Sequence, residues 1–119
     1  RGALNKHGRS ISNYHYEDLR LLYDSYQKFN LVNHACIVDA NHNNSGKKFD
    51  EQPRIVKEVI HSRNYDPDIK NLVKGVMVES YIEDGIQPVG GGCYGKSITD
   101  PCLGWDKTER LLKEVADLL

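Results

Sequence analysis

The sequence lacks a block of charge of one sign. Its 16 lysines and arginines balance 17 aspartates and glutamates, which leaves a formal net charge of -1 over 119 residues. A surface that binds nucleic acid needs clustered cations, so the composition disfavours that class. No apolar run approaches the roughly 20 residues of a membrane span, and the first residues lack the pattern of a secretory signal. We therefore expect neither nucleic acid nor a membrane among its partners.

Paired cysteines are also absent. Cys36, Cys93 and Cys102 are odd in number and have no CxxC spacing, which disfavours a disulfide framework or a zinc ribbon and favours the reducing cytoplasm. Cys102 lies close to Asp100 and could bind a metal, although an inert thiol is the simpler interpretation. The glycines within 85–92 match neither the GxGxxG nor the Walker pattern, so nucleotide binding is disfavoured.

Three segments have apolar residues at helical spacing. The first helix is predicted over about 16–29, with Asn13 as its N-cap, and the second from about Glu51 to Asn64, with Pro53 in its first turn. The third follows residue 104, where Asp106 and Glu109 resemble a capping box. The first and third helices should bury these apolar faces: Leu19, Leu22, Tyr23, Tyr26 and Phe29; Trp105, Leu111, Leu112, Val115 and Leu118.

Two short apolar segments, 34–39 and 72–79, read as buried parallel strands. Residues 65–68 between the second helix and the second strand are rich in turn formers. The order helix, strand, helix, strand, helix predicts an α/β chain, and 119 residues suffice for one small domain spanning 1–119.

Three candidate metal ligands follow these strands or the long loop after them. His42 and Glu79 come at or just after the carboxyl ends of the two strands, where parallel α/β structures bind ligands, and Asp100 precedes the last helix. One imidazole with two carboxylates suits Mn, Fe, Co or Zn. Taken singly, a loop histidine is more often solvated and a strand-end glutamate is more often salt-bridged. Asp39 could orient a neighbouring ligand or simply end its strand.

The same stretches carry a family resemblance. Ile37-Val-Asp-Ala-Asn-His-Asn-Asn-Ser45, Gly75-Val-Met-Val-Glu-Ser80 and Tyr94-Gly-Lys-Ser-Ile-Thr-Asp-Pro-Cys-Leu-Gly-Trp105 resemble the C-terminal part of type I 3-deoxy-D-arabino-heptulosonate 7-phosphate (DAHP) synthase. The resemblance covers essentially the whole chain. It implies the C-terminal portion of a (β/α)8 TIM barrel, with two parallel strands, three flanking helices and an incomplete barrel.

The resemblance also implies a reaction. DAHP synthase condenses phosphoenolpyruvate with erythrose 4-phosphate and water to give DAHP and phosphate, the first step of the shikimate pathway. It implies a divalent metal, Mn, Fe, Co or Zn, on His42, Glu79 and Asp100, and polarisation of the sugar aldehyde is the chemistry such a metal supplies. By the same resemblance, His42 is catalytic and contacts substrate. Arg1 would bind the phosphate of phosphoenolpyruvate through its planar fork.

Several family features have no counterpart in this sequence. The first is the fourth metal ligand, which is a cysteine of the first barrel strand. The second is the Lys-Pro-Arg segment that binds the sugar phosphate, and the third is the set of Lys and Arg residues from the middle strands that bind phosphoenolpyruvate. We therefore expect the chain to be a partial protein that is inactive alone and that self-associates as a homo-oligomer through open strand edges. The alternative is a non-catalytic metal-binding or interaction domain derived from the barrel. A metal hydrolase is a weaker interpretation, because no base lies beside a candidate metal-bound water.

Overall fold

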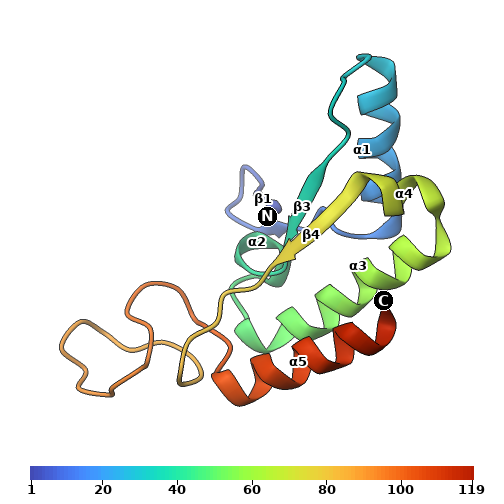
Figure 1. The fold of residues 1–119 in the computed structure, drawn as a ribbon. Coiled ribbons are helices and arrows are strands. Elements are labelled where there is room, and N and C mark those ends of the chain that lie inside the picture. Colours follow the sequence, from blue (N-terminus) through green and yellow to red (C-terminus); the bar gives the residue numbers. More distant parts are fainter.

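A parallel strand pair lies at the centre of the molecule. The computed structural model describes all residues 1–119, and in it β3 (Cys36–Asp39) pairs with β4 (Val73–Met77) so that Asp39 lies opposite Met77 (Figure 1). Parallel strands need a long crossover. Here the crossover consists of α2 (His42–Ser45), the 3-10 helix η1 (Phe49–Glu51), α3 (Gln52–Tyr65) and α4 (Pro67–Leu72). The expected α/β class and the parallel pairing are confirmed.

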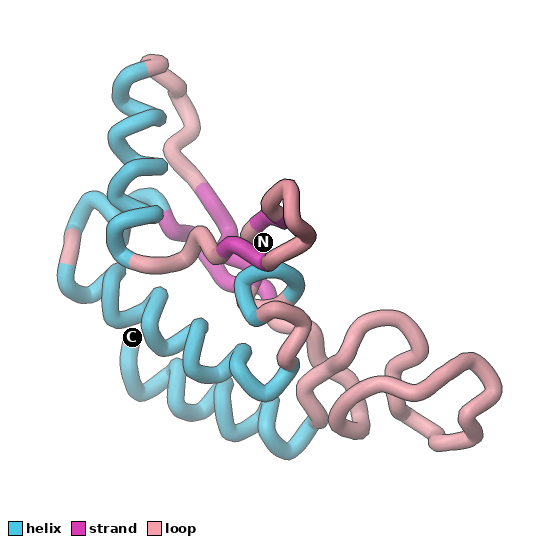
Figure 2. The backbone as a smooth tube through the Cα atoms, turned by 180° about the vertical axis from the view of Figure 1, so that it is seen from behind, coloured by secondary structure: helices cyan, strands magenta, loops and turns pink.

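The remaining elements flank this unit. An antiparallel hairpin of β1 (Ala3–Leu4) and β2 (Ser10–Ile11) lies beside α2, followed by α1 (Tyr16–Lys28). After β4 the chain makes a long excursion over 78–104, visible as a double loop in Figure 2, and ends in α5 (Trp105–Leu118). The result is two small sheets and five α-helices without a closed barrel. None of the helices combines the length and the apolar character that a membrane span requires.

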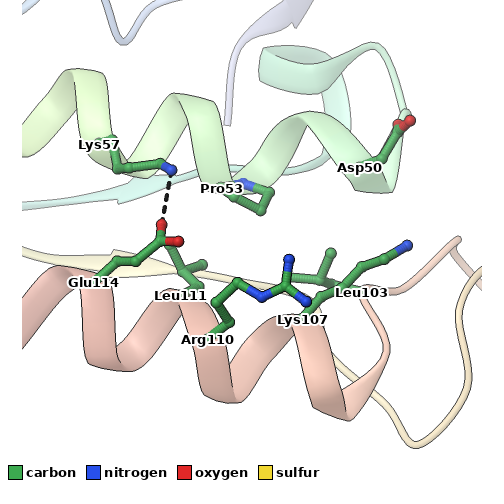
Figure 3. Close-up of a pocket in the computed structure, with 8 residues that line it drawn as sticks. All are labelled: Asp50, Pro53, Lys57, Leu103, Lys107, Arg110, Leu111 and Glu114. Atoms are coloured by element: carbon green, nitrogen blue, oxygen red, sulfur yellow. Dashed lines mark hydrogen bonds and ion pairs between the residues drawn. The ribbon is translucent and has the colours of Figure 1, made fainter.

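Helix α3 supplies the centre of the core. Its residues Ile55, Val56 and Val59 are at most 1% exposed and belong to the same buried cluster as Val38 and Val73 of the sheet. Helix α5 lies beside α3, and Lys57 of α3 forms an ion pair of 2.7 Å with Glu114 of α5 across an open groove of about 230 Å³ (Figure 3). The core therefore lies between one face of the sheet and these two helices.

The opposite face of the sheet is open. Strand alternation places Ile37 and Met77 on this face, and they are 68% and 43% exposed. The molecule measures 51 × 39 × 21 Å, and only 24 of its 119 residues are buried, so a large share of its apolar side chains meets solvent. The predicted apolar face of the first helix is accordingly wrong in part, because α1 buries only Leu19 while Phe29 is 67% exposed.

Both predicted helix caps are wrong. Helix α1 begins after His15, whose N–H donates to Asp18 at 3.1 Å, whereas the Asn13 side chain accepts from the Gly2 amide at 3.0 Å. Helix α5 begins after Gly104, so Asp106 lies inside its first turn. At α1 a local contact between His15 and Asp18 forms the cap, while Asn13 is engaged by the distant Gly2. At α5 the contact is distant in sequence, because Asp84 accepts from the Gly104 amide at 2.7 Å.

The predicted connector at 65–68 is shorter than expected: Tyr65 ends α3, Asp66 alone is non-helical, and Pro67 begins α4. The Asp66 carboxylate caps that helix by accepting from the Asp68 and Ile69 amides at 2.9 and 3.5 Å. It also accepts from the Tyr16 hydroxyl at 3.0 Å and pairs with Arg20 at 3.4 Å. Burial raises the pKa of the Asp66 carboxyl, but these hydrogen bonds outweigh it, and the pKa lies below its ordinary value. Asp66 thus joins α4 to α1.

We predict that Asp66→Ala lowers the free energy of unfolding by about 1–2 kcal/mol at pH 7, since it removes a helix cap and a hydrogen-bonded charge. A carboxyl whose pKa is lower in the folded protein stabilises the fold at any pH above its unfolded-state pKa. This stabilisation is lost as the pH falls through the folded-state pKa. The difference between the two proteins should therefore shrink below about pH 4 in urea titrations. Glu83→Ala removes an exposed carboxylate without an ion pair and is the control; an equal loss there would contradict the capping role.

Candidate metal centre

The parallel pairing brings three distant side chains together. His42 follows β3, Glu79 follows β4, and Asp100 lies on the return of the excursion. The Nε2 atom of His42 lies 3.0 Å from Oε1 of Glu79 and 3.4 Å from Oδ2 of Asp100. One ligand atom from each residue lies within 4.8 Å of the others, a grouping that could hold a metal ion. The prediction that these three residues share one site is consistent with this geometry.

The His42 ring is held from its far side. His42 is 9% exposed, and its Nδ1 atom lies 2.7 Å from Oδ2 of Asp39, which is itself 4% exposed. When Nδ1–H donates to this carboxylate, the lone pair of Nε2 faces the carboxylates of Glu79 and Asp100. The backbone of His42 has φ of 51°, a left-handed conformation that is uncommon for a residue with a side chain. Asp39 therefore fixes the tautomer and the direction of the ring.

Glu79 is positioned by two buried amides. The side chain of Gln52, at the first residue of α3 and fully buried, accepts from the Glu79 amide at 2.8 Å and donates to the Glu79 carbonyl at 3.0 Å. Asn41, also fully buried, donates from Nδ2 to Oε2 of Glu79 at 2.9 Å. Sequence reasoning missed both residues, because their partners lie 27 and 38 positions away.

Asp100 is positioned by the backbone hydrogen bonds that return the long loop to β4 and by a lysine side chain. Paired backbone hydrogen bonds between Gly85 and Cys102, and a bond from the Leu103 amide to the Glu79 carbonyl, bring the returning segment back beside β4. The Nζ atom of Lys47 donates to Oδ1 of Asp100 at 3.1 Å. This hydrogen bond holds the pKa of the Asp100 carboxyl below its ordinary value.

The donor atoms fit a small divalent ion. Two ligand atoms that each lie about 2.1 Å from one ion are separated by about 3.0–3.4 Å at octahedral and tetrahedral angles. The separations of 3.0 and 3.4 Å from the His42 nitrogen fall on this range. One neutral nitrogen and two carboxylate oxygens suit first-row ions rather than a thiolate cage. The residues present therefore fit a divalent metal.

Two further sequence candidates lie at the edge of this cluster. Cys102 donates from Sγ to the Asp100 carbonyl at 3.3 Å, and burial raises the pKa of its thiol, which favours the inert interpretation. The Arg1 side chain is exposed, while its carbonyl accepts from the Asn43 amide at 3.1 Å, next to His42. A Cβ at Gly2 would lie 2.5 Å from the Ile11 carbonyl oxygen of β2 and 3.0 Å from Asn43 of α2, so this close approach requires glycine.

Comparison with known proteins decides the family. A model of the DAHP synthetase I family matches residues 5–113. The chain belongs to this family. It is 36% identical over 119 residues to the Trp-sensitive phospho-2-dehydro-3-deoxyheptonate aldolase of Shigella flexneri, covering 97% of this chain and 33% of that protein. It is 37% identical over 122 residues to the Trp-sensitive enzyme of Enterobacter agglomerans, covering 95% and 34%.

A solved structure agrees with the sequence comparison. The phospho-2-dehydro-3-deoxyheptonate aldolase of Francisella tularensis SCHU S4 superposes on 89% of this chain with a TM-score of 0.76 and 26% identity, and the match covers 30% of that protein. This member of the DAHP synthetase I family thus spans about a third of the length of the curated relatives that it matches.

We predict that this DAHP synthetase I chain binds Mn²⁺ and that His42→Ala weakens the binding by more than about 100-fold, because the only nitrogen ligand is lost. Isothermal titration calorimetry and the electron paramagnetic resonance spectrum of Mn²⁺ measure the effect. His61→Ala is the matched control, since His61 is exposed on α3 and belongs to no ligand cluster. Equal Mn²⁺ affinity in both variants would rule out His42 as a ligand.

Proposed function

We propose that the chain carries the metal-binding part of the active site of a 3-deoxy-7-phosphoheptulonate synthase. The observation that carries the proposal is the convergence of His42, Glu79 and Asp100 beside β3 and β4 in a chain of the DAHP synthetase I family. The reaction condenses phosphoenolpyruvate with erythrose 4-phosphate and water to give DAHP and phosphate. Names of the relatives support this activity for the whole protein.

The fold we propose is the C-terminal portion of a (β/α)8 barrel, with residues 1–119 as one domain. Four features support it: the parallel β3–β4 pair, the helical crossover through α3, the open sheet edges, and the exposed face with Ile37 and Met77. A parallel sheet is ordinarily covered on both faces, so this open face fits the inner side of a barrel.

Within the proposed site, His42, Glu79 and Asp100 hold Mn, Fe, Co or Zn. The metal supplies Lewis-acid polarisation of the sugar aldehyde when bound. His42, held by Asp39, directs its Nε2 toward the two carboxylates and also borders the substrate. The exposed guanidinium of Arg1 would bind the phosphate of phosphoenolpyruvate bidentately. A hollow of about 400 Å³ within the segment 81–102 offers room for a ligand, although none of the three metal-ligand candidates lines it; its lining residues are Tyr81, Lys96, Ser97, Ile98, Thr99 and Cys102.

The isolated chain should bind metal without catalysing the condensation. These 119 residues contain no counterpart of the family's Lys-Pro-Arg segment, which binds the sugar phosphate. They also lack the middle-strand Lys and Arg residues that bind phosphoenolpyruvate. A non-catalytic metal-binding or interaction domain derived from the barrel is the second candidate, favoured by the same lack. Metal affinity fits both candidates, whereas turnover separates them. The mixed charge and the three free cysteines fit a cytoplasmic protein that binds neither nucleic acid nor membrane.

We predict that a chimera of the Shigella flexneri enzyme, in which residues 1–119 replace the matching third, is catalytically active. It should consume phosphoenolpyruvate only with erythrose 4-phosphate and a divalent metal. Introducing His42→Ala into the chimera should lower turnover by more than about 100-fold, because metal loading is lost; His61→Ala should not. A folded, metal-loaded chimera without activity would favour the non-catalytic domain. Turnover by the 119-residue chain alone would overturn its proposed inactivity.

We predict that the isolated chain forms homo-oligomers, since β3 and β4 each have an edge without a partner strand and share an exposed apolar face. Sedimentation velocity over a concentration series measures this. Ile37→Lys places a charge on that face and should shift the distribution toward monomer, whereas Leu21→Lys changes an equally exposed residue of α1 and should not. A strictly monomeric sedimentation profile at high protein concentration would contradict the prediction.

A further inference from the structure

Each carboxylate of the cluster has one oxygen already occupied. The Oε2 atom of Glu79 accepts a hydrogen bond of 2.9 Å from Nδ2 of Asn41, so only Oε1 faces His42. Asn41 is fully buried, and its other contacts hold it in this orientation. Its Oδ1 accepts from the Ser45 hydroxyl at 2.8 Å, and its Nδ2 lies 3.4 Å from the Pro101 carbonyl. The amide thus has no freedom to release Oε2.

Asp100 also has a hydrogen bond to one oxygen, from a lysine whose side chain is 61% exposed. Its Oδ1 accepts from Nζ of Lys47 at 3.1 Å, and Oδ2 lies 3.4 Å from Nε2 of His42. Lys47 reaches this position through an unusual backbone. Gly46 and Lys47 follow one another with φ of 61° and 62°, and the left-handed region costs a lysine about 1 kcal/mol. A strained lysine aimed at a ligand carboxylate points to a role for its ammonium group.

We propose that Asn41 and Lys47 are positioning residues that hold Glu79 and Asp100 as one-oxygen ligands, and that this makes the centre select small first-row ions over Ca²⁺. The inference rests on the proposed metal site. Ca²⁺ gathers six to eight oxygens at about 2.3–2.6 Å and commonly takes both oxygens of a carboxylate. With Oε2 turned toward Asn41 and Oδ1 turned toward Lys47, the donor atoms that face one another are Nε2, Oε1 and Oδ2, one from each residue. One-oxygen coordination at about 2.1 Å suits a smaller ion, whose remaining positions water can fill.

The test compares the dissociation constants of the chain for Mn²⁺ and Ca²⁺, by calorimetry and by displacement of Mn²⁺ followed by paramagnetic resonance. Both ions carry two charges, so a changed charge near the site alters both affinities together, and their ratio reports the coordination. Lys47→Asn removes the ammonium and retains a residue that tolerates the left-handed backbone. Asn41→Ala frees Oε2 of Glu79. In each variant the preference for Mn²⁺ over Ca²⁺ should fall by about tenfold.

Two controls separate coordination from charge and stability. Lys48→Asn makes the same charge change at an exposed neighbour without an ion pair, and it should leave the ratio unchanged. Lys47→Arg retains the cation and should keep the preference. Val59→Ala removes core volume from α3 away from the cluster, and it should lower stability without altering the ratio.

An unchanged ratio in folded Lys47→Asn and folded Asn41→Ala proteins overturns the proposal. A wild-type chain that binds neither ion overturns it together with the metal assignment. If the chimera is inactive but the variants show the expected shift in the ratio of Mn²⁺ to Ca²⁺ affinity, the proposed synthase function is wrong and the ion-selecting role of Asn41 and Lys47 is supported. The two conclusions thus have separate readouts.

Discussion

The register of the parallel β3–β4 pair is the constraint on which the rest of the structure depends. Asp39 lies opposite Met77, so His42 and Glu79, three and two residues farther on, emerge at one edge of the sheet. A slip of one residue would move the strand ends apart by about 3.3 Å and turn Val38 or Val76 away from α3. The core and the cluster thus require the same register, and burial of the valines contributes to the precise placement of His42 and Glu79.

Helix α3 extends this control beyond the end of the sheet. Strand β4 ends at Met77, yet both backbone polar groups of Glu79 are satisfied: Gln52 bonds its N–H and C=O as a neighbouring strand would, and the Leu103 amide also donates to the carbonyl. Gln52 belongs to the same helix that carries Ile55 and Val59 into the core. The packing of α3 against the sheet therefore sets where the Glu79 backbone lies, and a candidate ligand two residues past the strand gains the order of a core element.

The sequence predicted the elements that depend on apolar periodicity and the loops that carry a motif. It did not predict the helix caps and supporting residues that are set by contacts between distant parts of the chain. Regular apolar spacing located α1, α3, α5 and both parallel strands to within a few residues, and three motif strings indicated the loops that carry the candidate ligands. Asn13 and Asp106 have the composition of caps, but Asn13 bonds Gly2 and the amide of Gly104 bonds Asp84. Asp66-Pro67 suits a turn or a capped helix equally well, and only packing beside α1 favours the helix. Asn41 and Gln52 carry no local signal at all.

The charge balance of the cluster explains why so many polar groups are tolerated at the end of a small core. Asp39, Glu79 and Asp100 bring three carboxylates, and Lys47 brings one ammonium, which leaves a formal charge of -2 with a neutral imidazole. Gathering like charges is costly unless a partner compensates them, most of all for the buried Asp39; Glu79 and Asp100 are 26% and 30% exposed. A divalent cation among Nε2, Oε1 and Oδ2 would bring the group to neutrality. The same lysine and asparagine that occupy the outer oxygens thus leave both the charge and the donor atoms suited to one small divalent ion.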